Sequence, residues 1–199
     1  MRARLLGLET AFCLLLLASV EGCGSFRAGN VPSVSSWPLE SVAEEKAISV
    51  VVSGKTIING IEQEFSPPLL NLCRRQTVET YRASGLFSQV DGGVLDPDLR
   101  AEVTIVDQQV ISVWVDLLAL FTFMVTPSWH SDTWVMTTTL TNRAGHRLAT
   151  VEQSEVITTV YHLFLLLGSP SHWPDRVIKA TIEDLTRATL MDAHARGLV

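Results

Sequence analysis

The sequence contains few cysteines and few basic residues, and several common catalytic motifs are absent. Fifteen Lys and Arg stand against 21 Asp and Glu, which gives a formal net charge of −6. The basic residues form no cluster, which argues against nucleic acid as a partner. The same scarcity argues against electrostatic binding to anionic lipid, so we expect any membrane contact to be hydrophobic or covalent.

No motif in the chain identifies a catalytic centre. There is no Gly-rich phosphate loop, no His-Glu-x-x-His and no Gly-x-Ser-x-Gly. The five histidines are dispersed, and a divalent-metal site would require His130 with Asp132 to meet His172 with Asp175. Such short spacings arise easily by chance. We therefore expect no enzymatic activity, no cofactor and no metal.

The first 22 residues have the order of a secretory signal peptide. Arg2 and Arg4 supply a positive start, and an apolar stretch follows from about Phe12 to Val20 before Gly22 and Cys23. A positive end, a short apolar region and a small residue at the cut define such signals. The apolar stretch is too short to span a membrane, which takes about 20 apolar residues.

The end of this segment, Val20-Glu21-Gly22-Cys23, resembles the lipobox of bacterial lipoproteins. That resemblance implies cleavage before Cys23 and attachment of fatty acid, such as palmitate, to its thiol. Glu21 and Glu9 depart from the usual pattern, and an uncleaved anchor helix is the alternative. Gly24 in place of Asp is, by the same resemblance, compatible with the outer membrane, on its periplasmic side.

Cleavage would remove Cys13, and acylation would occupy Cys23. Cys73 would then be alone, so neither a disulfide nor a zinc site could form. Its apolar helical surroundings predict a buried, unreactive thiol. Residues 23–40 are rich in Gly, Ser, Asn and Pro and predict a flexible tether, followed by a single domain over residues 41–199.

Periodicity in this domain predicts the order β-α-β-β-β-β-α. The first helix begins at Pro67-Pro68 and stops before Gly85, and the last begins at Pro174 and persists to about Ala195. Strands are predicted over residues 47–52, 99–107, 110–115, 134–141 and 147–159. This order indicates an α+β two-layer sandwich, with a mostly antiparallel sheet and both helices on one face.

Two apolar runs, Val110 to Val125 and Val156 to Leu167, are longer than a small sheet needs. Each run is followed by a short tail that begins with a hydroxyl residue, Pro and Ser. Trp and His come next, in either order, and an Asp follows two residues later. Three interpretations remain open: buried core segments, paired loops that present apolar surface to lipid or a partner protein, or a membrane span over the first run. Under the second, the contact residues are Leu118, Phe121, Phe123, Trp129, Leu165, Leu166 and Trp173, with indole at the boundary between apolar and aqueous surroundings.

Three further segments resemble small, mostly uncharacterised bacterial envelope lipoproteins. They are Ala83 to Val90, Leu99 to Ile105 and the terminal Ala195 to Val199. The order of elements is similar to the amino-terminal domain of TolB, to LpoB-type lipoproteins and to auxiliary lipoproteins of lipid-transport systems. No motif in this resemblance is specific enough to transfer an activity. Our leading hypothesis is a non-enzymatic accessory subunit that binds an envelope protein partner through its sheet edge or apolar loops. A lipid-handling protein that holds an acyl chain between the apolar runs is the alternative, and a hydrolase is the third.

Overall fold

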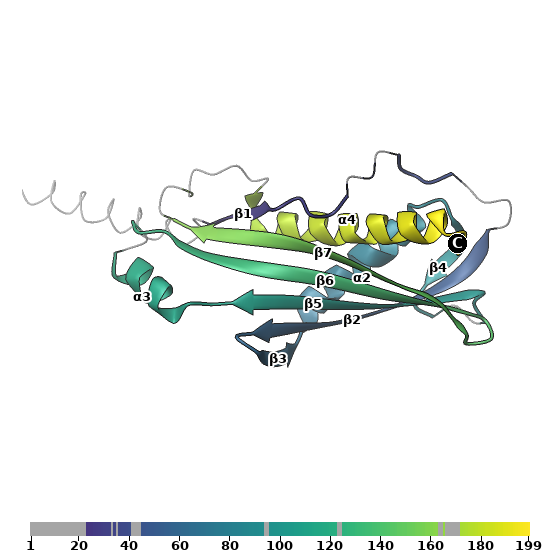
Figure 1. Cartoon of the computed structure of the whole chain (residues 1–199), viewed down its shortest axis with the longest axis horizontal. Coiled ribbons are helices and arrows are strands. Elements are labelled where there is room, and N and C mark those ends of the chain that lie inside the picture. Colours follow the sequence, from purple (N-terminus) through teal and green to yellow (C-terminus); the bar gives the residue numbers. More distant parts are fainter. Residues whose placement is uncertain are drawn as a thin grey trace, which may run out of the picture.

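The computed structural model describes residues 23–32, 34, 36–40, 45–93, 96–122, 125–162, 165 and 172–199. Within these residues, three helices and one seven-stranded sheet form an elongated α+β structure (Figure 1). The helices are α2 (Pro67–Arg82), α3 (Val113–Phe121) and α4 (Pro174–Ala195). The strands are β1 (Cys23–Arg27), β2 (Lys46–Ile58), β3 (Ile61–Glu64), β4 (Phe87–Asp91), β5 (Leu99–Val110), β6 (Ser128–Asn142) and β7 (Arg147–Tyr161).

The sheet has the order β1-β7-β6-β5-β2-β3, and β4 also pairs with β2. Pairing is antiparallel except where β2 runs parallel to β4 and β5. The predicted α+β class and mostly antiparallel sheet are therefore confirmed. The predicted number of helices and order of elements do not match, because β1, β3, β4 and α3 were not anticipated.

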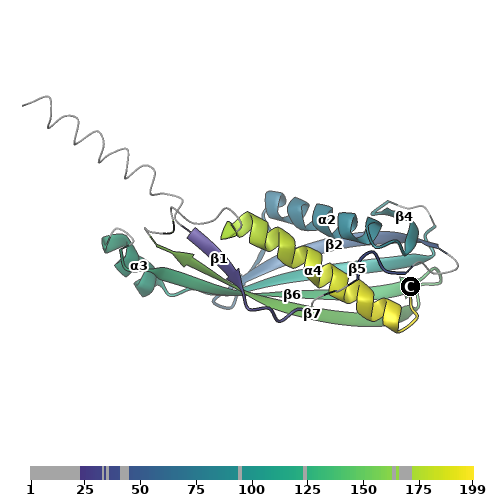
Figure 2. The same ribbon diagram turned by 90° about the horizontal axis from the view of Figure 1, so that it is seen from above.

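Helices α2 and α4 pack beside each other over one face of the sheet (Figure 2). Alternate residues of β5, Leu99, Ala101, Val103 and Ile105, are buried under them, as the alternation in the sequence predicted. Helix α4 contributes Val177, Ile182, Leu185 and Leu190 to the same core. Both helices begin at a proline in the first turn, and Gly85 follows α2 with a positive φ of 76°.

The prediction of a strand over residues 110–115 was wrong. β5 ends at Val110, and α3 begins three residues later. The side chain of Asn59 binds the backbone N–H and C=O of Ile111 at 3.0 and 3.1 Å, which satisfies the chain where it leaves the sheet. A short apolar run without periodicity fits a strand and a helix equally well, so its pattern could not decide between them.

The first residues of the segment predicted as a flexible tether form a strand instead. Cys23 to Arg27 form β1, which pairs antiparallel with β7 from Tyr161 to Ile157. Ser25 is buried and its Oγ lies 2.7 Å from Thr159 Oγ1. Gly and Ser give this segment the composition of a linker, but here Gly24 and Ser25 are buried in a paired strand at the sheet edge.

The exposed apolar end as candidate functional site

Helix α3 lies at one end of the elongated molecule (Figures 1 and 2). Most of its side chains, and several beside it in sequence, are large, apolar and exposed. Trp114 is 82% exposed and Phe121 is 79% exposed, and Ala119 is the one buried residue of this helix. We call this surface the apolar end; its members are Val110, Val113, Trp114, Leu117, Leu118, Leu120, Phe121, Val125 and Trp129. Contiguous apolar patches of this kind mark surfaces that bind lipid or protein.

Polar contacts hold α3 to the sheet. Asp116, in the first turn of α3, accepts a hydrogen bond of 2.5 Å from Ser128 Oγ and lies 3.3 Å from His130 Nε2. Thr122 closes the helix by donating its hydroxyl to the carbonyl of Leu118 at 2.9 Å. Asp116 thus attaches the helix to β6, Thr122 closes its last turn, and its apolar side chains remain exposed.

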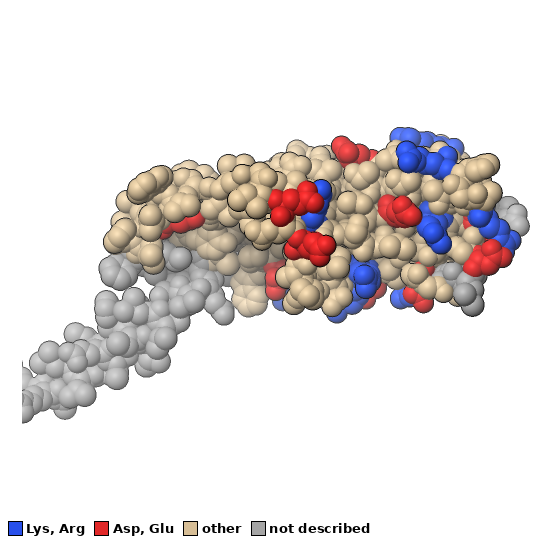
Figure 3. All heavy atoms as spheres, turned by 90° about the horizontal axis from the view of Figure 1, so that it is seen from below, with Lys and Arg blue, Asp and Glu red and all other residues tan. Residues whose placement is uncertain are grey.

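Basic residues are absent from the sequence around this end. No Lys or Arg occurs between Arg100 and Arg143, or between Arg147 and Arg176. Asp116 is the one acid within α3, and its carboxylate is engaged by Ser128 and His130. Figure 3 shows the corresponding end of the molecule as largely uncharged, while Lys and Arg gather toward the other end.

Cys23 lies at the same end of the sheet. Cys23 and Ser128 both pair with Tyr161, from opposite sides of β7. Two interstrand spacings therefore separate Cys23 from Ser128, which is about 10 Å. Since Ser128 binds Asp116 of α3, the predicted lipidation site and the apolar end are neighbours.

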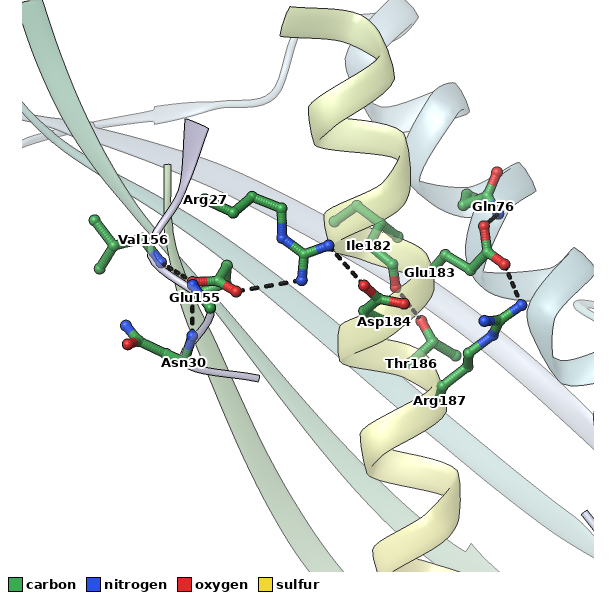
Figure 4. Close-up of polar contacts among 11 residues, drawn as sticks. Arg27, Asn30, Gln76, Glu155, Val156, Ile182, Glu183, Asp184, Thr186 and Arg187 are labelled. Atoms are coloured by element: carbon green, nitrogen blue, oxygen red, sulfur yellow. Dashed lines mark hydrogen bonds and ion pairs between the residues drawn. The ribbon is translucent and has the colours of Figure 1, made fainter. Parts of the chain in front are cut away.

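A buried ion pair fixes β1 in place (Figure 4). The Glu155 carboxylate, fully buried in β7, lies 3.2 Å from Arg27 Nη2, and Arg27 Nη1 lies 2.6 Å from Asp184 of α4. Glu155 also accepts hydrogen bonds from the backbone N–H groups of Gly29 and Asn30, each at 3.1 Å. Burial alone would raise the pKa of Glu155, but the backbone hydrogen bonds and Arg27 outweigh it and hold this pKa below its usual value.

A second acid, Asp107, is buried where β5 and β6 approach the apolar end. It accepts a hydrogen bond of 2.5 Å from Gln109 Nε2. Burial, together with the nearby Asp132, raises the pKa of Asp107 to about 6. Among the described residues, no group of three or more His, Cys, Asp or Glu side chains could hold a metal ion.

The structure distributes the predicted contact residues unevenly. Leu118, Phe121 and Trp129 are exposed members of the apolar end. Leu165 is partly buried near Gly24 of β1, and Trp173 is half exposed at the start of α4, with Arg176 over its ring at 5.8 Å. Phe123 and Leu166 lie outside the described residues.

Sequence reasoning missed Trp114 and Val110, although both belong to the first apolar run. The pattern of this run did not show that β5 ends at Val110 and that a helix follows, which leaves both side chains exposed. No helix in the described part of the chain is long and apolar enough to cross a membrane. No protein-family model matches this chain, and the search of curated proteins also finds no match.

Proposed function

We propose that this protein is a lipid-anchored bacterial envelope lipoprotein, held by fatty acid on Cys23 at the periplasmic face of the outer membrane. Its role is that of a non-enzymatic accessory subunit of an envelope complex. The observation that supports this most is the position of Cys23, which begins β1 beside the exposed apolar end. The signal-like segment before Cys23 supports the same proposal from the sequence.

The arrangement around Ser128 supports a binding role rather than catalysis. Nucleophilic catalysis by serine requires a base in hydrogen-bond contact with its hydroxyl. Here Ser128 Oγ donates to Asp116, and the same carboxylate oxygen lies 3.3 Å from His130. The carboxylate stands between the hydroxyl and the imidazole, an arrangement that ties α3 to β6.

An envelope protein partner has a suitable contact at the sheet edge. β3 is an edge strand, all four of its residues are exposed, and Ile61 is among the exposed large apolar residues. Edge strands accept further strands through their backbone groups. A photo-crosslinking amino acid in place of Ile61 should give a discrete adduct in cells, whereas the same residue in place of Arg143, at the β6–β7 turn, should not. Equal patterns at both positions would contradict contact at this edge.

Lipidation is tested separately by growth with radiolabelled palmitate. The wild-type chain should incorporate label, and Cys23→Ser should lose it while keeping the same expression level. An unlabelled wild-type chain would contradict the proposed anchor. This comparison does not depend on which partner the protein binds.

A lipid-handling protein is the second candidate, favoured by the apolar end. Holding an acyl chain requires an apolar cavity, however, and a groove of about 600 Å³ beside α2 is lined in part by Arg74, Arg75, Glu79 and Arg82. Native mass spectrometry after gentle purification distinguishes the two candidates. A lipid bound in addition to any lipid on Cys23 would favour the carrier, and its absence would favour the accessory subunit.

A further inference from the structure

We propose that the apolar end enters the same bilayer that holds the Cys23 lipid, so that α3 lies in the membrane interface and the elongated domain stands end-on. This inference rests on the proposed lipid anchor. It adds a second, noncovalent membrane contact and a fixed orientation of the domain. Apolar side chains buried at the membrane interface would add to the affinity that acylation supplies.

Because Cys23 is part of β1, a lipid on this cysteine would bring α3 close to the membrane. All five residues from Cys23 to Arg27 pair with β7, so no flexible spacer separates the lipid from the sheet. The Arg27–Glu155 ion pair and the Ser25–Thr159 hydrogen bond hold this strand in place. With α3 attached to Ser128, about 10 Å from Cys23, acyl chains on Cys23 bring the helix to the headgroup region.

The form of α3 fits an interfacial location. Nine residues extend about 14 Å as a helix, well short of the roughly 30 Å hydrocarbon core. Its exposed side chains are Val, Trp, Leu and Phe on most sides, with Asp116 directed to Ser128 and His130. Trp114 and Trp129 supply indoles, which prefer the boundary between hydrocarbon and water.

Charge indicates which membrane surface is suitable. Residues 101–142, which include the whole of α3, contain no Lys or Arg to bind acidic headgroups. A zwitterionic bilayer requires no complementary charge, so it is the occupant we assign to the apolar end. The opposite end of the sheet carries Arg143 and Arg147 around the β6–β7 turn, which suits the aqueous side.

The test compares two single substitutions in the intact lipoprotein, Phe121→Cys at the apolar end and Leu148→Cys near the β6–β7 turn. Both wild-type side chains are exposed apolar residues, so neither change should affect folding. Each cysteine is labelled with the fluorophore NBD, and Cys73 stays unlabelled because it is fully buried. The protein is then reconstituted into phosphatidylcholine vesicles.

The rate at which aqueous dithionite reduces NBD reports exposure to water. We expect reduction at residue 121 to be at least tenfold slower than at residue 148, with quenching of residue 121 by doxyl-labelled lipid. Equal rates would overturn the inference. Protection at residue 121 without quenching by doxyl lipid would also overturn it, since a protein would then cover α3.

Intact mass separates these failures from failure of the anchor itself. Acylated Cys23 with equal dithionite rates leaves the proposed function standing and refutes the membrane contact of α3. An unacylated Cys23, which would also accept NBD and add a second label, refutes the proposed function and with it the inference.

Discussion

The Glu155 carboxylate, with no exposed surface, lies 3.2 Å from the guanidinium of Arg27 in a strand that begins at Cys23. Arg27 reaches Asp184 of α4 at 2.6 Å as well, so one side chain joins β1, β7 and a helix. Through these ion pairs β1, whose composition is that of a linker, is part of the folded domain. The orientation of the domain relative to a lipid on Cys23 depends on it.

Arg27→Ala should destabilise the protein because it leaves the Glu155 carboxylate buried without its cation. Loss of one partner of a buried pair costs about 3–5 kcal/mol. Glu155 retains hydrogen bonds from Gly29, Asn30 and Val156, so we expect a loss of about 2–3 kcal/mol. Urea unfolding at pH 7 measures this loss.

Arg143→Ala is the matched control for that measurement. Arg143 pairs with Asp96, but both side chains are largely exposed to solvent. Surface ion pairs contribute little to stability, so the urea midpoint should not change. Equal effects of the two substitutions would show that burial of Glu155 is not what makes the β1 contact important.

Asp107→Asn should stabilise the protein near neutral pH. The pKa of Asp107 is raised from 3.8 to about 6 by burial and by Asp132, so the folded state binds this proton more tightly than the unfolded chain does. Protonated Asp107 therefore contributes to the free energy of unfolding, fully below about pH 4, and this contribution is lost as pH rises through about 6.

Asparagine remains neutral at every pH and can still accept the hydrogen bond from Gln109. The variant should therefore exceed the wild type by about 2 kcal/mol at pH 7–8, with the difference vanishing below pH 4. Urea midpoints at five pH values between 4 and 8 measure this difference. A constant difference across that range would show that Asp107 does not titrate as described.

Cys73 should be unreactive in the native protein. Cys73 belongs to α2 and its side chain is fully buried, and this burial, with a smaller effect of Asp107, raises the pKa of its thiol to about 12. Maleimide should modify Cys73 in 8 M urea and leave it unmodified in buffer over an hour. Rapid native labelling at Cys73, located by peptide mass mapping, would contradict its burial.

Gly54→Ala should destabilise the protein because a Cβ there would overlap the ring of Phe65. Phe65 is itself buried, with its ring centre 5.9 Å from that of Trp134, so the ring has little room to move. Overpacking of this kind costs about 1–3 kcal/mol. Gly93→Ala, where a Cβ would meet nothing within 4 Å, should leave the thermal midpoint unchanged.

Leu118→Ser combined with Phe121→Ser should leave folding intact. Both side chains are exposed, and surface substitutions usually change stability by less than about 0.5 kcal/mol. Circular dichroism and the thermal midpoint should match the wild type, while binding to phosphatidylcholine vesicles, measured in the unacylated Cys23→Ser background, falls. Unfolding of this variant would show instead that α3 packs in a core.

Periodicity predicted the parts of the fold that have a buried face. The alternation from Leu99 to Ile105 and the apolar spacing of α4 report burial directly, and the prolines and glycines located the helix ends. The short strands β3 and β4 carry too few residues for a pattern. β1 could not be recognised because its burial comes from Ser25 and from a pairing 134 residues away.

The sequence indicated that the candidate site would be apolar and named some of its residues, but it did not indicate where they lie relative to Cys23. The length of the first apolar run indicated surplus apolar residues, and Leu118, Phe121 and Trp129 are indeed exposed. Their proximity to Cys23 was not predictable, because it arises from the register in which both Cys23 and Ser128 meet Tyr161. Register depends on strand pairing across the whole sheet rather than on local sequence.

The intact mass of the protein extracted from membranes tests the proposed anchor most directly. We predict a chain that begins at Cys23 and carries additional mass corresponding to fatty acid, located on Cys23 by fragmentation. A chain that still begins at Met1, or one with an unmodified Cys23, would contradict the anchor and the end-on orientation that depends on it.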